Sequence, residues 1–293
     1  MRVFLTGATG FIGSAIAAEL IGAGHQVRGL VRSDVGAASL RAAGAEPFSG
    51  TIEHLGSLRD GADGCDAIIH TAFDHDFSHF AANCEKDRRV IMALGEAFAG
   101  SARPLVITGV TAIGSAAPGQ PADEDRVNLG HPNPRVASEQ ACAALIERGL
   151  NLSVVRLSQI HNEARQGLVT EMIALARRTG VSAWVGEGGN RWSAAHLLDT
   201  AQLYRLALEG GRAGARYHAT AEQGIAFRQI AERIGERLGV PSMSIPADAV
   251  AAHFGWLAKF ADADMSADSS KTRERLDWSP KGPGLLTSLD AIS

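Results

Sequence analysis

Three glycines near the start of the chain have the spacing that brings a backbone close to a pyrophosphate. Gly7, Gly10 and Gly13 follow an apolar run at residues 2–5 and precede a helical pattern at residues 12–21. In this order of elements, the first glycine turns the chain off a strand, the second lets the backbone approach phosphates, and the third lets the helix pack on the sheet. The helix N-terminus would offer free N–H groups and a partial positive charge. We therefore predict a dinucleotide cofactor, held by a loop that comprises Gly7, Thr9, Gly10, Phe11, Ile12 and Gly13.

The second predicted strand, residues 26–32, ends on a basic residue, Arg32. An acidic residue at that place would bind the ribose 2′-hydroxyl of NAD, whereas an arginine accommodates the 2′-phosphate of NADP. Arg28 and Ser33 could assist. Asp34 is the competing signal for NAD, but it lies beyond the strand end, where it would instead cap the next helix. We therefore expect NADP(H), with NAD(H) as the alternative.

Hydride transfer to a carbonyl or imine also needs a proton donor, and histidines follow two predicted strands. His75 and Asp76 follow the run at residues 67–71, at the strand end where open α/β sheets bind ligands. A histidine between two carboxylates would have a raised pKa and could donate a proton near neutral pH. The plainer interpretation is a polar loop, or a helix start capped by Asp76. His161 follows the run at residues 152–157 and would face the substrate or bond to backbone.

Hydroxyl groups stand at the end of another predicted strand, residues 105–108. Thr108 and Thr111 could bond to a substrate oxygen, or equally to their own backbone. The candidate catalytic residues are therefore His75, Asp76, Thr108, Thr111 and His161. Beside the glycine loop, the candidate cofactor residues are Arg32, Ser33, Thr71, Ala72, Thr108 and Ser158.

The elements that must position these residues alternate between strand and helix. Continuous apolar runs, typical of parallel strands buried on both faces, lie at residues 2–5, 26–32, 67–71, 105–108 and 152–157. Helical patterns between them lie at residues 12–21, 33–43, 88–98 and 135–148. This alternation predicts an α/β fold of the Rossmann type, a doubly wound parallel sheet that brings the strand ends to one edge.

The alternation changes after about residue 158. Further helices are expected at residues 167–178, 197–209, 227–238 and 247–254, with a glycine-rich loop at 186–192 and a short strand at 216–220. We therefore predict an NAD(P)-binding Rossmann domain over residues 1–158. A smaller substrate-binding lobe would occupy residues 159–293, and some of its segments could return to the sheet.

Composition and charge exclude several classes of protein. The chain has 293 residues, is 45% hydrophobic and carries a net charge of −4, with acids and bases mixed along it. No Lys/Arg cluster indicates nucleic acid or a membrane surface, and no apolar run is long enough to cross a bilayer. Cys65, Cys84 and Cys142 lack metal-ligand spacing and predict reduced, buried thiols. With its first core strand at the N-terminus, the chain is expected to be cytoplasmic, without a metal, and to act on a small molecule.

These motifs together resemble the extended branch of the short-chain dehydrogenase/reductase superfamily. Residues 6–13, Thr-Gly-Ala-Thr-Gly-Phe-Ile-Gly, look like its cofactor loop, and residues 67–72 like its fourth strand and cofactor-lining turn. Residues 105–114 resemble its fifth strand, which normally delivers a catalytic Ser or Thr, and residues 153–158 a strand that ends beside the nicotinamide. Residues 191–199 resemble a segment of its substrate lobe. The resemblance implies kinship with NAD-dependent epimerase/dehydratases and ketone reductases.

One departure from the family concerns its proton-transfer pair, Tyr-x-x-x-Lys, on the helix after the fifth strand. Arg135 stands for the tyrosine and Glu139 for the lysine, and the only tyrosines, Tyr204 and Tyr217, lie far down the chain. Gly109 replaces one serine of the usual Ser/Thr cluster. Arg135 could pair with Glu139 one helical turn away, or bind an anionic group. This pattern places the chain with atypical extended members, which include working reductases and cofactor-binding proteins without catalysis.

The sequence therefore favours an NADP(H)-dependent oxidoreductase that acts on a small organic carbonyl, imine or activated double bond with a non-standard proton donor. The alternative is a non-catalytic NAD(P)-binding sensor or regulator. A nucleotide-sugar-type epimerase or dehydratase is a weaker alternative, because that chemistry also relies on the missing tyrosine. His196 could line the pocket, and core packing explains most aromatics of the second half, although one or two could wall an apolar pocket: Trp184, Trp192, Phe254, Trp256 and Phe260. Residues 88–98 are apolar enough to allow the homodimer common in the family.

Overall fold

The computed structural model describes residues 1–117 and 119–292 and contains a central sheet of seven parallel strands in the order β10-β6-β5-β4-β1-β2-β3. The strands are β1 (Arg2–Thr6), β2 (Gln26–Val31), β3 (Glu46–Ser49), β4 (Ala67–His70), β5 (Leu105–Val110), β6 (Leu152–Leu157) and β10 (Arg216–Ala219). The order reverses between β1 and β4, which is the point where such sheets bind ligands. The predicted α/β doubly wound fold is confirmed.

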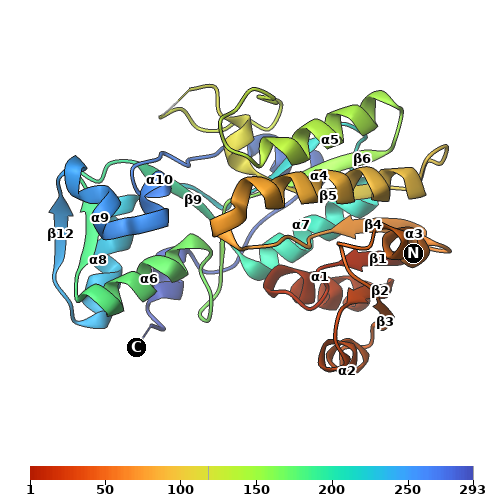
Figure 1. Ribbon diagram of the computed structural model, residues 1–293, viewed down its shortest axis with the longest axis horizontal. Helices are drawn as coiled ribbons and strands as arrows, with labels where there is room; N and C mark the ends of the chain where they lie inside the picture. Colours follow the sequence, from red (N-terminus) through yellow and green to blue (C-terminus); the bar gives the residue numbers. More distant parts are fainter. Residues whose placement is uncertain (118, 293) are drawn as a thin grey trace.

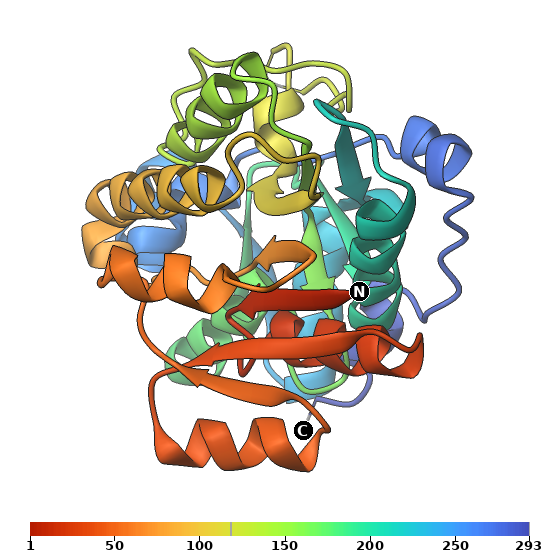
Figure 2. The ribbon, with the colours of Figure 1, turned by 90° about the vertical axis from the view of Figure 1, so that its right-hand side faces the viewer.

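Helices cover both faces of this sheet (Figure 1 and Figure 2). One face carries α3 (Leu55–Ala62), α4 (Phe80–Ala97) and α5 (Val136–Glu147), and the other carries α1 (Phe11–Gly22) and α7 (Leu197–Gly210), which pack against each other. Helix α2 (Asp34–Ala42) lies beside β3. Successive strand residues point to opposite faces, so Phe4 enters the core under α3 and α4 while Val3 and Leu5 enter the core under α1 and α7. Burial on both faces explains the continuous apolar runs.

Two elements of the first half escaped sequence prediction, and one helix is longer than expected. Strand β3 is a short edge strand, Glu-Pro-Phe-Ser, that pairs only with β2, so its proline is tolerated and its pattern is weak. Helix α3 is short and contains two glycines. Helix α4 begins at Phe80 rather than at residue 88, because residues 80–87 are mostly small, polar or charged and show no apolar helical pattern.

The second half of the chain builds a separate lobe, seen at the left of Figure 1. Its strands are β7 (Gln159–His161), β9 (Arg191–His196) and β11 (Glu222–Ala226) in one sheet, and β8 (Ser182–Val185) with β12 (Ser242–Ile245) in another. Its helices are α6 (Leu168–Thr179), α8 (Phe227–Leu238), α9 (Val250–Phe254), α10 (Ala258–Ala261) and α12 (Leu285–Leu289). Helix α11 (Ser270–Leu276) instead contacts α7 and β10 of the larger part of the molecule. The predicted glycine-rich loop at 186–192 is shorter than expected, because β9 already begins at Arg191. Trp192, Phe227 and Ile230 lie at the centre of the lobe core.

Besides α11, two segments beyond residue 158 belong to the large sheet. Helix α7 covers the same face as α1, and β10 extends the sheet by pairing in parallel with β6. The strand expected at 216–220 therefore lies in the large sheet rather than in the lobe. All three cysteines are buried and unpaired, and no helix in the described part of the chain is long and apolar enough to cross a membrane.

Candidate active site

The glycine loop is packed too tightly for any other residue at two of its positions. Gly7 has φ +72°, and a Cβ there would lie 2.7 Å from both the Ala72 amide nitrogen and the Thr71 Oγ1. A Cβ on Gly13 would collide with the Gly7 carbonyl. The close contact holds the start of α1 against the end of β4, with Thr71 and Ala72 beside the loop as predicted.

The start of α1 leaves backbone donors free. Gly10 is its N-cap residue and provides no side chain to cap it, and no acidic residue stands in the first turn. The N–H groups of Phe11, Ile12 and Gly13 reach no acceptor among the described residues. Thr9 and Gly10 are exposed, so the approach to these donors is open. This arrangement fits the pyrophosphate of a dinucleotide.

The residues after β2 fit a second anionic group. Arg32 is exposed and makes no ion pair or hydrogen bond with any described residue. Arg28 is not available to help it, because it pairs with Glu46 at 3.2 Å. Ser33 caps α2 by accepting a hydrogen bond from the Gly36 amide at 3.2 Å, so Asp34 is a first-turn residue of α2 and not, as expected, its cap.

A buried polar network lies behind the loop, between the sheet and helices α4 and α5. The His70 ring joins the Thr6 hydroxyl (2.6 Å) to the Asp87 carboxylate (2.9 Å). The other Asp87 oxygen accepts from Ser138 (2.6 Å) and Arg135 (3.0 Å). Burial alone would raise the pKa of Asp87, but the Arg135 charge and the hydrogen bonds from His70 and Ser138 outweigh it and lower the pKa. The network therefore holds a buried carboxylate.

The structure does not pair Arg135 with Glu139. The Arg135 guanidinium also donates to the Thr108 carbonyl (3.0 Å) and lies 4.2 Å from the centre of the Phe73 ring. Glu139 is fully buried and instead binds Arg156 (2.6 Å) and Arg216 (3.1 Å). The predicted one-turn ion pair was wrong because the fold supplies each charge with a closer partner from another element.

The two threonines at the end of β5 differ in what their hydroxyls do. The Thr108 hydroxyl donates to the His70 carbonyl (2.7 Å) and lies 2.6 Å from the hydroxyl of Tyr204 on α7. Burial raises the pKa of Tyr204, so this phenol stays protonated. The Thr111 hydroxyl, in contrast, bonds to no described residue. Of the pair, only Thr111 has a hydroxyl without a hydrogen-bond partner among the described residues, and this residue is 5% exposed.

The histidine segment after β4 reaches this region but does not have the expected acidity. His75 is exposed, and its ring lies 5.3 Å from that of Phe73. Partial desolvation and the positive charge of Arg135 lower the pKa of His75, so the raised pKa predicted from its neighbouring carboxylates was wrong. Asp76 caps a short 3-10 helix, Phe77–His79, and hydrogen bonds from Ser78 and His79 lower its pKa to about 2. The plainer interpretation of Asp76 as a helix start is the one that the geometry shows.

The predicted residues after β6 are engaged in packing. The Ser158 hydroxyl donates to the Ala219 carbonyl at 2.5 Å. His161 is fully buried against Ser288 (2.9 Å) and the ring of His196, and burial and then the charge of His196 lower its pKa to about 4. His196 itself caps α7 through the Leu198 amide. The structure therefore brings His75 and Thr108 to Arg135 but leaves His161 outside this group.

Sequence reasoning missed several of the residues that define the region. Asp87 lies in a charged stretch of α4 that, from the sequence, suggested an exposed surface. Tyr204 lies 96 residues after its partner Thr108. Neither residue therefore had sequence neighbours that indicated its role. Arg165 follows β7 and approaches the glycine loop, 5.9 Å from the Phe11 ring. His70 is the last residue of β4, a strand that the sequence predicted, and it stands opposite Thr6 of β1. The strand assignment could therefore have indicated that these two side chains lie on the same face of the sheet.

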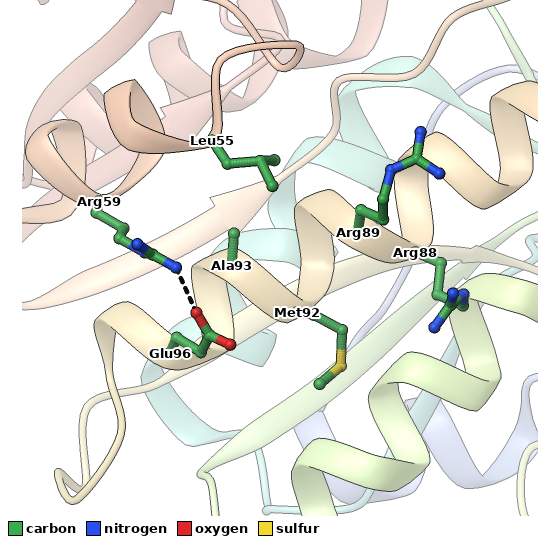
Figure 3. Close-up of a pocket in the computed structure, with 7 residues that line it drawn as sticks. All are labelled: Leu55, Arg59, Arg88, Arg89, Met92, Ala93 and Glu96. Atoms are coloured by element: carbon green, nitrogen blue, oxygen red, sulfur yellow. Dashed lines mark hydrogen bonds and ion pairs between the residues drawn. The ribbon is translucent and has the colours of Figure 1, made fainter.

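A depression between α3 and α4 lies on the outer surface, away from this region (Figure 3). The side chains that line it are Leu55, Arg59, Arg88, Arg89, Met92, Ala93 and Glu96. Arg59 is paired with Glu96 and Arg88 with Glu85. Two of its three arginines are thus neutralised by ion pairs, and the chemistry-bearing groups lie elsewhere.

Comparison with known proteins identifies the class. A family model described as NAD(P)H-binding matches residues 7–183. An uncharacterized protein of Schizosaccharomyces pombe is 44% identical over 290 residues, covering 99% of this chain and 98% of that protein. The 4-hydroxy-2-methyl-3-oxo-4-farnesyl-3,4-dihydroquinoline-1-oxide ketoreductase of Stigmatella aurantiaca is 29% identical, covering 87% and 80%. A solved dTDP-glucose 4,6-dehydratase double mutant from Streptomyces venezuelae, with NAD and DAU bound, shares the fold with a TM-score of 0.78 at 20% identity, covering 100% and 95%.

The chain belongs to the NAD(P)H-binding family. Within it, the chain is an atypical extended short-chain dehydrogenase/reductase that carries Arg135 and Glu139 in place of the Tyr and Lys. Its family and fold are those of NAD(P)-dependent enzymes.

Proposed function

We propose that the protein is an NADP(H)-dependent reductase of small organic carbonyl compounds. The observation that carries the cofactor preference is Arg32, an exposed and unpaired guanidinium at the end of β2. Guanidinium groups bind phosphate in two parallel hydrogen bonds. The glycine loop would hold the pyrophosphate, and Thr71 and Ala72 would flank the cofactor. Similarity to the Stigmatella aurantiaca ketoreductase supports the reaction class.

The proton donor in this proposal is Thr111, whose hydroxyl has no hydrogen-bond partner among the described residues. When bound, the reduced nicotinamide supplies the hydride that reaches the carbonyl carbon. The Thr111 hydroxyl donates a hydrogen bond to the carbonyl oxygen and passes on a proton taken from water. Arg135 has its charge balanced by Asp87 and orients Thr108 and Phe73. His75 is neutral at pH 7 and acts as a hydrogen-bond donor rather than an acid.

The cofactor is tested by titrating the protein with NADPH and with NADH while following cofactor fluorescence. Arg32→Ala should weaken NADPH binding about 10- to 100-fold, the range for a lost charge-assisted contact, and leave NADH binding unchanged. Arg41→Ala is the matched control, because Arg41 is also exposed but lies near the end of α2. A stronger affinity for NADH in the unmodified protein would exclude the role given to Arg32.

The reaction is tested by following NADPH oxidation with a panel of aldehydes and ketones. Thr111→Val should lower kcat by about 100-fold, as expected for the loss of one donor to a developing oxyanion. Thr108→Val should retain turnover within a few-fold and lose stability, since its hydroxyl bonds only to protein groups. Tight NADPH binding without turnover of any carbonyl would favour a cofactor-binding sensor. An equal loss of kcat in Thr111→Val and Thr108→Val would exclude the assignment of Thr111 as the proton donor.

A further inference from the structure

A row of aromatic rings leads outward from the predicted site. Phe73 follows Ala72 at the glycine loop, and its ring lies 5.3 Å from His75. The His75 ring lies 6.3 Å from that of Phe77, which stacks on Trp256 at 4.6 Å with an interplanar angle of 13°. Phe80 adds a tilted contact, 5.4 Å from Phe77 with an interplanar angle of 40°. The row is continuous from the cofactor loop to the protein surface.

The last contact of the row joins two distant parts of the chain. Phe77 lies in the connection between β4 and α4, whereas Trp256 lies in the lobe, in a short 3-10 helix (Gly255–Leu257) between α9 and α10. Among the described residues, the ring contacts between these two parts of the chain are the stack and the approach of the Lys259 ammonium to 4.9 Å from the centre of the Phe80 ring. No hydrogen bond joins the two segments among the described residues. The stack can therefore separate without breaking a hydrogen bond between the two segments.

The exposure of these rings differs from that of core aromatics. Trp256 is 41% exposed, whereas Trp184, Trp192 and Trp278 are between 1% and 7% exposed. Phe73 and Phe77 are half-buried and His75 is exposed. Ring pairs of this kind contribute only a modest free energy beyond the area that they bury. A flat ligand between Phe77 and Trp256 would replace their contact with two contacts of its own. These two contacts would recover the free energy that is lost when the two rings separate.

We propose that Phe77 and Trp256 form the binding site for a planar, conjugated ring of the substrate, so that the enzyme acts on aromatic or otherwise conjugated aldehydes and ketones. This proposal rests on the proposed reductase function. The ring would stack on Trp256, with Phe73 and His75 at its edge, and its carbonyl group would point along the row toward Thr111 and the cofactor. Because Asp87 balances the charge of Arg135, this guanidinium does not require an anionic substrate.

Binding can be measured without turnover, because Trp256 is the exposed tryptophan among the four of the chain. Iodide quenching of tryptophan fluorescence should fall when benzyl alcohol is added, and should change much less with cyclohexylmethanol, a saturated alcohol of similar size. In Trp256→Leu the iodide-sensitive fraction should be lost. Equal protection by the two alcohols, or protection by neither, would overturn the proposal.

Selectivity is measured with NADPH as the ratio of kcat/KM for benzaldehyde to that for cyclohexanecarbaldehyde. Trp256→Leu and Phe77→Leu should each lower this ratio about two- to tenfold, the range expected for one aromatic contact, and Trp256→Phe should restore most of it. Phe260→Leu is the control, since the Phe260 ring meets Trp256 at an interplanar angle of 84° instead of stacking on it, and this variant should keep the ratio of the unmodified protein. A ratio that is unchanged in both leucine variants would overturn the ring site. Protection of Trp256 by benzyl alcohol with no turnover of any carbonyl would instead retain the ring site and reject the reductase.

Discussion

Replacing Asp87 by asparagine would remove the charge that balances Arg135 in the buried network. Asp87 is 4% and Arg135 is 7% exposed, and the two charged groups approach to 3.0 Å. Breaking a buried ion pair by removing one partner typically costs about 3–5 kcal/mol, because the other charge is left uncompensated. For a chain of this size, where 1 kcal/mol shifts the melting temperature by about 2–4 °C, Asp87→Asn should melt roughly 10 °C lower.

A double-mutant cycle separates this pairing from general damage to the core. Arg135→Met alone leaves the Asp87 carboxylate uncompensated and should destabilise by a similar amount. The double variant should be more stable than the sum of the single effects predicts, by about 2–3 kcal/mol in urea unfolding. Additive effects within about 0.5 kcal/mol would refute the reasoning, since they would mean that the two groups do not depend on each other.

The pH dependence provides a second measurement on the same pair. The pKa of Asp87 is lower in the folded chain than its ordinary value of 3.8. A lowered pKa means that the stabilisation is present in full above the unfolded pKa and disappears as the pH falls through the folded pKa. The stability difference between the unmodified protein and Asp87→Asn should therefore stay constant from about pH 5 to pH 8 and narrow below about pH 4. A difference that grows on acidification would contradict the charged state of Asp87.

Three further outcomes test separate parts of the structure. Tyr204→Phe removes one buried hydrogen bond to Thr108 and should cost about 0.5–1.5 kcal/mol in thermal unfolding, and an unchanged melting temperature would mean that this bond does not stabilise the fold. Gly13→Ala should abolish NADPH binding in the fluorescence titration, because the added methyl group collides with the Gly7 carbonyl, and unchanged affinity would exclude the close packing of α1. Since the pKa of His75 is lowered below 6.5, its imidazole is neutral through pH 7–9, and His75→Gln should leave the shape of the pH–rate profile over that range unchanged.

The features that the sequence predicted correctly are those that depend on residues close together in the chain. The parallel strands at the centre of the sheet were predictable because burial on both faces leaves continuous apolar runs, and the glycine loop because its spacing is a short-range property. The acidity of His75 was predicted with the wrong sign. Its sequence neighbours are acidic, but the fold places Arg135 against it, and desolvation adds to the same shift.

The partners of buried charges could not be read from the chain. Glu139 has Arg135 one turn away in sequence, yet it binds Arg156 and Arg216 from two strands of the sheet. Such pairings depend on which helix covers which strand, and the return of β10 to the sheet edge was not evident from its short apolar run. The buried network around Asp87 escaped prediction for the same reason.

The return of α7 and β10 to the large sheet also constrains how this protein can be divided. A cut at residue 158 would remove an edge strand from the sheet and the helix that covers α1, so neither half would retain an intact core. The lobe is built from two separate stretches of the chain, one before α7 and one after β10, rather than from a module attached at one end. Exchange of one continuous segment therefore cannot replace the lobe while the central sheet stays whole.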